Sequence, residues 1–236
     1  MTHAILTADA HAHTRVRPER GAAMGDALMS CILVPDEFRR AQHEYLILFR
    51  RDIGTGEVAA VALLGFENGE NLYLDGDRWD AAYVPLAMDT RPFLIGRGAE
   101  GEGGQVHLDA ASARLSEEEG TRLFDDTGRP TPYLEGAVEK LGALDEGYRA
   151  AAGFFAALAR HELLEPLQLD VTLDDGSVNR LVGFHVVDED RLQALSPNAL
   201  GDLHREGHLM PVFMALASQS NLPALIARKN RTLVHG

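Results

Sequence analysis

The stretch Leu167–Val187, LQLDVTLDDGSVNRLVGFHVV, decides the fold class of this chain. Its apolar residues fall into two runs, Leu167–Leu173 and Val178–Val187, which the polar segment Asp174–Ser177 separates. An Asp-Gly pair between apolar runs is a strong β-hairpin signal, because both residues tolerate a positive φ. We therefore predict an antiparallel hairpin with these two runs as its strands.

The segment before this hairpin predicts a long helix. Its apolar residues recur at helical spacing from Leu134 to Leu158. We expect the helix to run from Pro132 to about Leu164, because Pro166 cannot continue it. Four glycines weaken it by up to about 1 kcal/mol each, and they either admit a close neighbour or mark a break: Gly136, Gly142, Gly147 and Gly153.

Shorter elements complete the prediction. After the hairpin, Asp188 is expected to cap one short helix and Ser196 with Pro197 to start another, and helical spacing continues through 210–216 and 224–228. In the first half we expect a short helix over 35–43 and strands over 45–49, 58–66, 71–75, 93–95 and 105–109. The predicted class is α+β, with antiparallel sheets, a long central helix and a helical C-terminal segment.

The domain organisation follows from the same patterns. Residues 1–20 show no apolar period, so we expect a flexible N-terminal arm, whose His11 and His13 are not expected to hold a metal. We expect residues 21–236 to form a single domain, within which 29–115 and 130–236 are candidate subdomains.

Composition and charge exclude several classes of function. The 236 residues are 45% hydrophobic and 25% charged, as is ordinary for a globular protein. The net charge is −14, from 36 acidic against 22 basic residues, and it repels nucleic acid and anionic lipid. The densest basic stretch, Arg228, Lys229 and Arg231, suits the end of a helix. We expect no nucleic-acid partner.

The chain is expected to lie in the cytoplasm without inserting into a membrane. Its longest apolar run, Ala150–Ala159, is shorter than the roughly 20 residues of a membrane span. Met1–Ala10 has neither the basic start nor the apolar core of a signal peptide. Cys31 is the one cysteine and lies in an apolar stretch, so we expect it to be a buried thiol in a reducing compartment.

Two motifs resemble cofactor or metal sites and are interpreted as structural. Gly96–Gly101, GRGAEG, matches the dinucleotide pattern G-x-G-x-x-G, but it leads into a strand and contains acidic residues. His204 and His208 have the spacing of a zinc-binding helix, but Gly207 favours the end of that helix before His208. We expect no metal, no cofactor and no catalytic residue set.

The stretch Asp75–Asp80, DGDRWD, is the most unusual in the chain. It fails the calcium-loop pattern, because Trp79 stands where an oxygen ligand is needed. The candidate ligand-binding residues are Arg78, Trp79, Asp80 and Tyr83, because an aromatic face beside charges suits a saccharide or a peptide. In the alternative interpretation, which is the commoner case, Trp79 anchors the loop and Arg78 pairs with a carboxylate.

The chain also resembles a known family. Twelve blocks carry the resemblance, in this order: Arg17–Asp26, Val34–Phe38, Gly65–Asp75, Arg78–Asp80, Tyr83–Pro85, Pro92–Ile95, Leu123–Asp126, Thr131–Leu134, Leu163–Pro166, Asp174–Gly176, Leu203–His204 and Ser220–Leu222. Together they resemble the SapC-like family of bacteria from about Arg15 to Leu233.

The resemblance implies a role associated with nutrient uptake, and it identifies no catalytic residues. Members often occur beside TonB-dependent receptors, cupin-like proteins and flavin-dependent halogenase-like proteins. We therefore expect a non-enzymatic cytoplasmic accessory or ligand-binding protein for saccharide or peptide uptake. A homo-oligomer is compatible with this expectation. The alternatives are an enzyme or enzyme partner acting with the cupin-like or halogenase-like proteins, and a surface-layer protein.

Overall fold

The computed structural model describes residues 3–96 and 104–235, with the side chains of 234 and 235 left aside. The chain divides into two compact units. Unit 1 comprises residues 1–27, 74–80 and 86–146, and unit 2 comprises residues 28–73, 81–85 and 147–236. These boundaries differ from the subdomains 29–115 and 130–236 considered above, because the chain passes between the units several times.

Unit 1 carries three small antiparallel sheets, with the strand orders β1-β9-β8, β10-β2-β11 and β6-β7. Its core is formed by Val16, Phe93, Leu108, Leu123 and Leu134, among others. Its elements are β1 (His3–Ile5), α1 (Ala8–His11), β2 (Arg15–Val16), η1 (Ala22–Met24), β6 (Leu74–Asp75), β7 (Arg78–Trp79), α3 (Leu86–Asp89), β8 (Phe93–Gly96), β9 (Gln105–Asp109), β10 (Leu115–Ser116), β11 (Thr121–Arg122) and the first half of α4 (Pro132–Arg160).

The N-terminal residues differ from the flexible arm expected for 1–20. β1 pairs with β9, with Ile5 opposite His107, and β2 lies between β10 and β11. The Thr7 hydroxyl caps α1 by accepting from the Ala10 N–H. Strands of two or three residues are too short to show an alternating pattern, so their pairing depends on distant partners that local sequence does not reveal.

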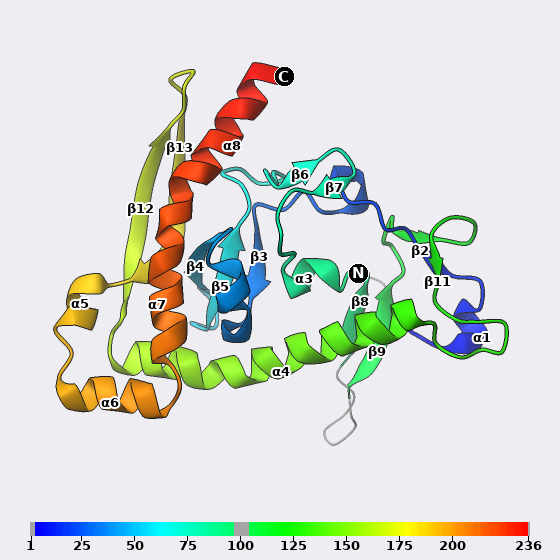
Figure 1. Ribbon diagram of the computed structural model, residues 1–236, viewed down its shortest axis with the longest axis horizontal. Helices are drawn as coiled ribbons and strands as arrows, with labels where there is room; N and C mark the ends of the chain where they lie inside the picture. The colour runs from blue at the N-terminus through cyan, green and yellow to red at the C-terminus, as the bar shows by residue number, and fades with distance from the viewer. Residues whose placement is uncertain (1–2, 97–103, 236) are drawn as a thin grey trace. The chain divides into compact units, whose positions relative to one another are not determined.

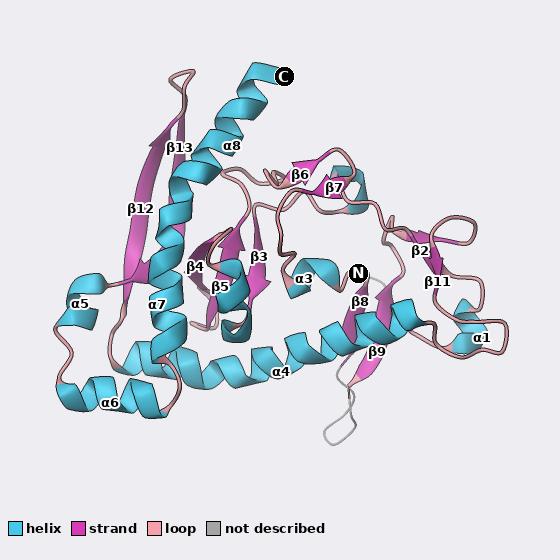
Figure 2. Ribbon diagram, viewed as in Figure 1, coloured by secondary structure: helices cyan, strands magenta, loops and turns pink. Residues whose placement is uncertain are grey.

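Unit 2 is built on one five-stranded antiparallel sheet with the order β12-β13-β4-β5-β3. The core of unit 2 includes the fully buried side chains of Phe49 and Leu48 on β4 and Leu63 on β5. Its elements are β3 (Ser30–Leu33), η2 (Pro35–Glu37), α2 (Phe38–Ala41), β4 (Leu46–Arg51), β5 (Val58–Leu63), the second half of α4, β12 (Leu164–Thr172), β13 (Val178–Val187), α5 (Glu189–Gln193), α6 (Pro197–Arg205), α7 (Leu209–Ser218), η3 (Gln219–Asn221) and α8 (Leu222–His235). Figure 2 shows both classes of element, and the fold is α+β.

The strands β12 and β13 form the antiparallel hairpin that the sequence predicted for the runs 167–173 and 178–187. Gly176 adopts φ +84° in the turn. The Asp175 carboxylate accepts hydrogen bonds from the Ser177 N–H and hydroxyl, at 2.9 and 2.6 Å. The pairing extends to Leu164 opposite Val187, so β12 begins three residues earlier than predicted. Gly176 and the Asp175 carboxylate thus stabilise the turn that the Asp-Gly signal predicted.

Most other predicted elements are confirmed, but several end earlier than expected, among them α4 at Arg160 and β5 at Leu63. The strands β4 and β5 pair as a hairpin, and β8 pairs with β9. Within 71–75, only Leu74–Asp75 forms a strand. The motif Gly96–Gly101 lies outside the described residues except for Gly96. Cys31 is buried, as expected.

The long helix α4 is continuous through all four of its glycines. A Cβ built on Gly147 would lie 2.6 Å from Cγ2 of the buried Val34, whereas one built on Gly136 or Gly142 would meet nothing within 4 Å. The glycines thus mark no break. One of them admits a close neighbour, which was one of the two alternatives left open by the sequence.

The C-terminal helices begin where their caps predict. The Asp188 carboxylate accepts from the Arg191 N–H at 2.9 Å, and the Ser196 hydroxyl accepts from the Ala199 N–H at 3.2 Å. The segment α7–η3–α8 packs against β4 and β13 through α7 (Figure 1). By length and composition alone, Leu209–Leu233 could cross a membrane. A core helix of a soluble protein meets the same criterion.

Candidate functional site

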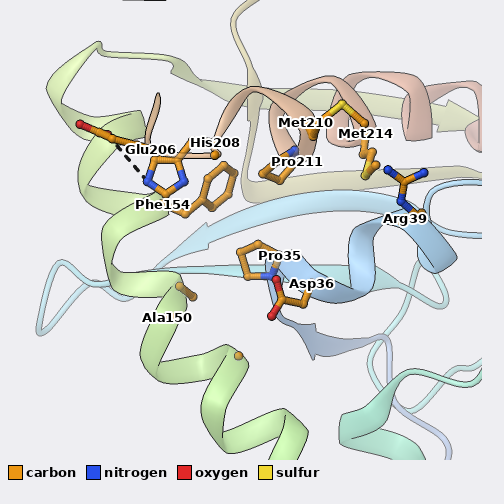
Figure 3. A pocket seen from close by; sticks show the side chains of 13 residues that line it. Pro35, Asp36, Arg39, Ala150, Phe154, Glu206, His208, Met210, Pro211 and Met214 are labelled. Carbon is orange, nitrogen blue, oxygen red and sulfur yellow. Dashed lines mark ion pairs between the residues drawn. The ribbon is translucent and has the colours of Figure 1, made fainter. Parts of the chain in front are cut away.

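A cleft of about 470 Å³ lies entirely within unit 2. Its walls come from η2 and the start of α2, from the second half of α4, and from the turn that leads into α7 (Figure 3). Small residues on α4 open this space, because Gly147, Ala150 and Ala151 present little side chain where the three elements meet. Ligand sites are commonly clefts of about 300–1,000 Å³, so this one can hold a small molecule.

The apolar lining of the cleft comes mainly from α4 and α7. Phe154 is buried and packs edge-on against Phe38, with the ring centroids 6.0 Å apart. From α7, Met210 is half exposed and Met214 is buried, and Pro211 lies between them. This lining is adaptable, because unbranched methionine side chains can fit apolar groups of different shapes.

Two opposite charges stand on the wall formed by η2 and α2. Asp36 and Arg39 are exposed and line the cleft. They lie three residues apart in sequence, with Asp36 beside Pro35 and Arg39 at the end of the cleft where Met214 lies (Figure 3). Neither side chain forms a hydrogen bond or an ion pair with any residue that the structure describes, which leaves both charges available to a ligand.

Glu206 and His208 form the opposite wall. Arg160 donates a hydrogen bond to Glu206 at 2.6 Å, and this contact lowers the pKa of the Glu206 carboxyl. The His208 Nε2 lies 3.8 Å from Glu206 Oε2, and its ring meets Phe154 edge-on at a centroid distance of 5.7 Å. The side chain of His208 is only 17% exposed, so its position is set by packing against Phe154.

His204 and His208 do not lie on one helical face. This agrees with the sequence, which predicted that the helix ends before His208. Helix α6 ends at Arg205, and Gly207 takes φ +79° in the turn that follows. His204 is exposed on α6, whereas His208 lines the cleft. Within residues 3–96 and 104–235, no three His, Cys, Asp or Glu side chains are close enough together to hold a metal ion.

Three of the four residues predicted to bind a ligand lie in unit 1. Arg78 and Trp79 form β7, where Trp79 pairs with Leu74, and Asp80 follows. Trp79 is partly buried. The Arg78 guanidinium pairs with the Asp75 carboxylate at 2.9 Å, and both side chains are exposed. For Arg78 this is the contact that the alternative interpretation predicted.

Tyr83, the fourth residue, belongs to unit 2 and holds a buried carboxylate. Its hydroxyl donates to Glu37 Oε1 at 2.6 Å, and the Arg40 guanidinium lies 4.8 Å from its ring centroid. The structure therefore divides the four predicted residues between the units. A ligand site formed by them stays a prediction, and the four residues do not line the cleft described above.

The basic stretch near the C-terminus faces the protein. Lys229 is buried and donates to Glu70 and Glu67 at 2.6 and 3.1 Å. Burial lowers the pKa of Lys229, but the two glutamates outweigh it and the net pKa is raised. The Arg228 guanidinium lies 4.5 Å from the ring centroid of Tyr73. Two of the three cations thus have partners inside the fold.

Sequence reasoning missed the cleft. It assigned Asp36 to the start of a helix and gave no role to Arg39. The available signal was the set of glycines and alanines within 147–153, which leaves a strip of α4 with little side chain. Which residues face that strip depends on tertiary contacts between segments more than 100 positions apart.

Comparison with known proteins gives a family and no closer relative. The family model for SapC matches residues 6–225, which is nearly the whole chain. No curated protein and no solved structure shows significant similarity to it. The match extends through both units and includes every residue that lines the cleft. The chain belongs to the SapC family.

Proposed function

We propose that this protein is a non-enzymatic, cytoplasmic ligand-binding protein that assists nutrient uptake, and that the cleft of unit 2 is its binding site. The observation that carries the proposal is the composition of the cleft. An apolar lining lies between two available charges, Asp36 and Arg39, and a histidine held by packing. Binding sites for small molecules combine apolar walls with a few polar groups in this way.

The alternative of an enzyme would use His208 as the proton carrier. A catalytic histidine is commonly oriented by a hydrogen bond to a carboxylate, but His208 Nε2 lies 3.8 Å from Glu206 Oε2, which is too far for such a bond. The described residues of the cleft lining include no hydroxyl, thiol or amine side chain that could act as a nucleophile. These features support binding over covalent catalysis.

The uptake role rests on the family context rather than on geometry. A saccharide and a peptide are both transported nutrients that a cleft of this volume can hold. The cytoplasmic location is part of the same proposal and rests on the acidic composition and the single cysteine. Fractionation of cells that express the full chain tests the location independently of any ligand.

Filling the cleft tests the binding site directly. Ala150 is exposed and lines the cleft, so Ala150→Trp should occupy the space without disturbing the buried core. The matched control is Ala156→Trp, which changes an exposed alanine of the same helix that lies outside the cleft lining. Binding of sugars, amino acids and short peptides is followed by thermal shift and calorimetry.

The two variants should separate clearly. A ligand at 100 times its Kd stabilises the folded protein by about 2.7 kcal/mol, which is a shift of several degrees at this size. We expect that shift in the native protein and in Ala156→Trp, and its loss in Ala150→Trp. A ligand that shifts all three proteins equally would place binding elsewhere and reject the cleft.

A further inference from the structure

We propose that the ligand of the cleft is an amino acid or a short peptide with an apolar side chain, bound as a zwitterion. Its ammonium group pairs with Asp36, its carboxylate pairs with Arg39, and its side chain lies against Met210 and Pro211, the accessible apolar residues at the start of α7. This inference rests on the proposed function, because it names the class of ligand for the same cleft.

The charges of the η2–α2 wall match a zwitterion. A free carboxylate and a free guanidinium stand three residues apart, and neither is neutralised by another described residue. A guanidinium forms two parallel hydrogen bonds with a carboxylate, and a carboxylate accepts from an ammonium group. A ligand with one charge of each sign satisfies both residues and adds no net charge to the cleft.

The apolar lining lies where the rest of such a ligand would extend. Figure 3 shows Met214 at the same end of the cleft as Arg39, and Phe154 beside His208. Met210 is half exposed, so it can cover an apolar group as it enters. Flexible methionines accept side chains of different shape, which favours a ligand class over one defined ligand.

The same lining argues against the other nutrient classes. A saccharide is normally held against the open face of an aromatic ring, but Phe154 is only 1% exposed and its ring packs on other aromatic rings. An anionic nutrient such as a phosphate ester would meet Asp36 and Glu206 in the cleft. A zwitterion with an apolar side chain needs no exposed aromatic face, and it brings no net negative charge toward Asp36 and Glu206.

Capped peptides test the inference on the unaltered protein. The probes are leucyl-leucine, its N-acetylated form, its C-terminal amide and the doubly capped molecule, each measured by calorimetry. We expect each single cap to weaken binding about tenfold, which corresponds to about 1.4 kcal/mol. Equal affinity for all four peptides would overturn the zwitterion proposal.

Two variants assign each end of the peptide to its residue. In Asp36→Asn the N-acetyl group should no longer weaken binding, while the amide cap still does. In Arg39→Gln the pattern should be reversed. The controls Asp174→Asn and Arg231→Gln change exposed charges of unit 2 that lie outside the cleft lining, and they should keep the native pattern.

The outcomes distinguish this inference from the proposed function. Suppose the capped peptides bind as well as leucyl-leucine and Ala150→Trp abolishes binding of all four. The cleft is then a binding site, but its ligand is not recognised as a zwitterion. If neither these peptides nor any sugar or amino acid binds the native protein, the proposed function and this inference both fail.

Discussion

Asp26 and Arg114 form the most deeply buried ion pair described in unit 1. Their side chains are 0% and 3% exposed, and Arg114 Nη2 lies 2.5 Å from Asp26 Oδ2. The same carboxylate oxygen accepts from the Gly21 N–H, and Arg114 Nη1 donates to the Glu19 carbonyl at 2.9 Å. The pair therefore fixes the loop that contains Arg17–Asp26, one of the blocks that resemble the family.

Removing one partner of this pair should destabilise unit 1 strongly. Asp26→Asn leaves the Arg114 charge buried without its counter-charge, and we expect a loss of about 3–5 kcal/mol in the free energy of unfolding. The control is Asp75→Asn, which breaks the exposed pair with Arg78 and should cost no more than about 1 kcal/mol. Urea denaturation of both variants measures the difference. Similar losses in the two would show that burial does not govern these pairs.

Tyr73 predicts how stability depends on alkaline pH. Burial raises its pKa to about 12 from an ordinary value of 10, and its hydroxyl donates to the Glu44 carbonyl at 2.7 Å. The fold favours the neutral phenol, so its contribution is complete below pH 10 and falls as the pH rises toward about 12. In Tyr73→Phe this decline should be weaker, although the variant is less stable at neutral pH. Urea denaturation across this range tests it, and an unchanged decline would contradict it.

At the scale of the element, helix α4 shows that its four glycines are not equivalent. Gly142 has open space where a Cβ would lie, so Gly142→Ala should raise the free energy of unfolding by up to about 1 kcal/mol. Gly147→Ala should lower it, because the new Cβ would lie 2.6 Å from Val34 Cγ2. Thermal denaturation of the two variants gives the sign of each change. A gain in both would mean that Val34 moves aside freely.

Local sequence predicts the elements whose signals are local. Gly176 in the turn, Asp188 and Ser196 at their helix starts, and the absence of proline from α4 after its first residue each act within a few residues, and the predicted structures are confirmed there. The short strand β1 pairs with residues about 100 positions away. Pairing over such a distance leaves no local pattern, and the N-terminal strands were therefore missed.

The candidate site follows the same rule. Trp79 was predicted to bind a ligand because a tryptophan beside charged residues is visible in the sequence without knowledge of the fold. Asp36 and Arg39 look like ordinary helix residues until Ala150 and Met214 are placed opposite them. A cleft between distant segments is a property of packing, so the sequence could supply its residues but not their proximity.

At the scale of the whole molecule, the dominant electrostatic property is the net charge of −14. Several cations that could oppose it have partners within the fold. Lys229 pairs with Glu67 and Glu70, and Arg114 pairs with Asp26. The field outside the protein is therefore negative on average, and it should act on a ligand according to the net charge of that ligand.

Because of this field, the salt dependence of the Kd should differ between peptides of different net charge. Leucyl-lysine carries one net positive charge, so the protein attracts it, and its Kd should rise several-fold between ~0.01 M and ~0.15 M ionic strength as the Debye length falls from ~30 to ~8 Å. Leucyl-leucine has no net charge, and its Kd should change much less because its charges are paired at short range. Calorimetry at the two salt concentrations measures both. An equal response of the two peptides would mean that the acidic surface does not reach the cleft, and that Asp36 and Arg39 alone set its preference.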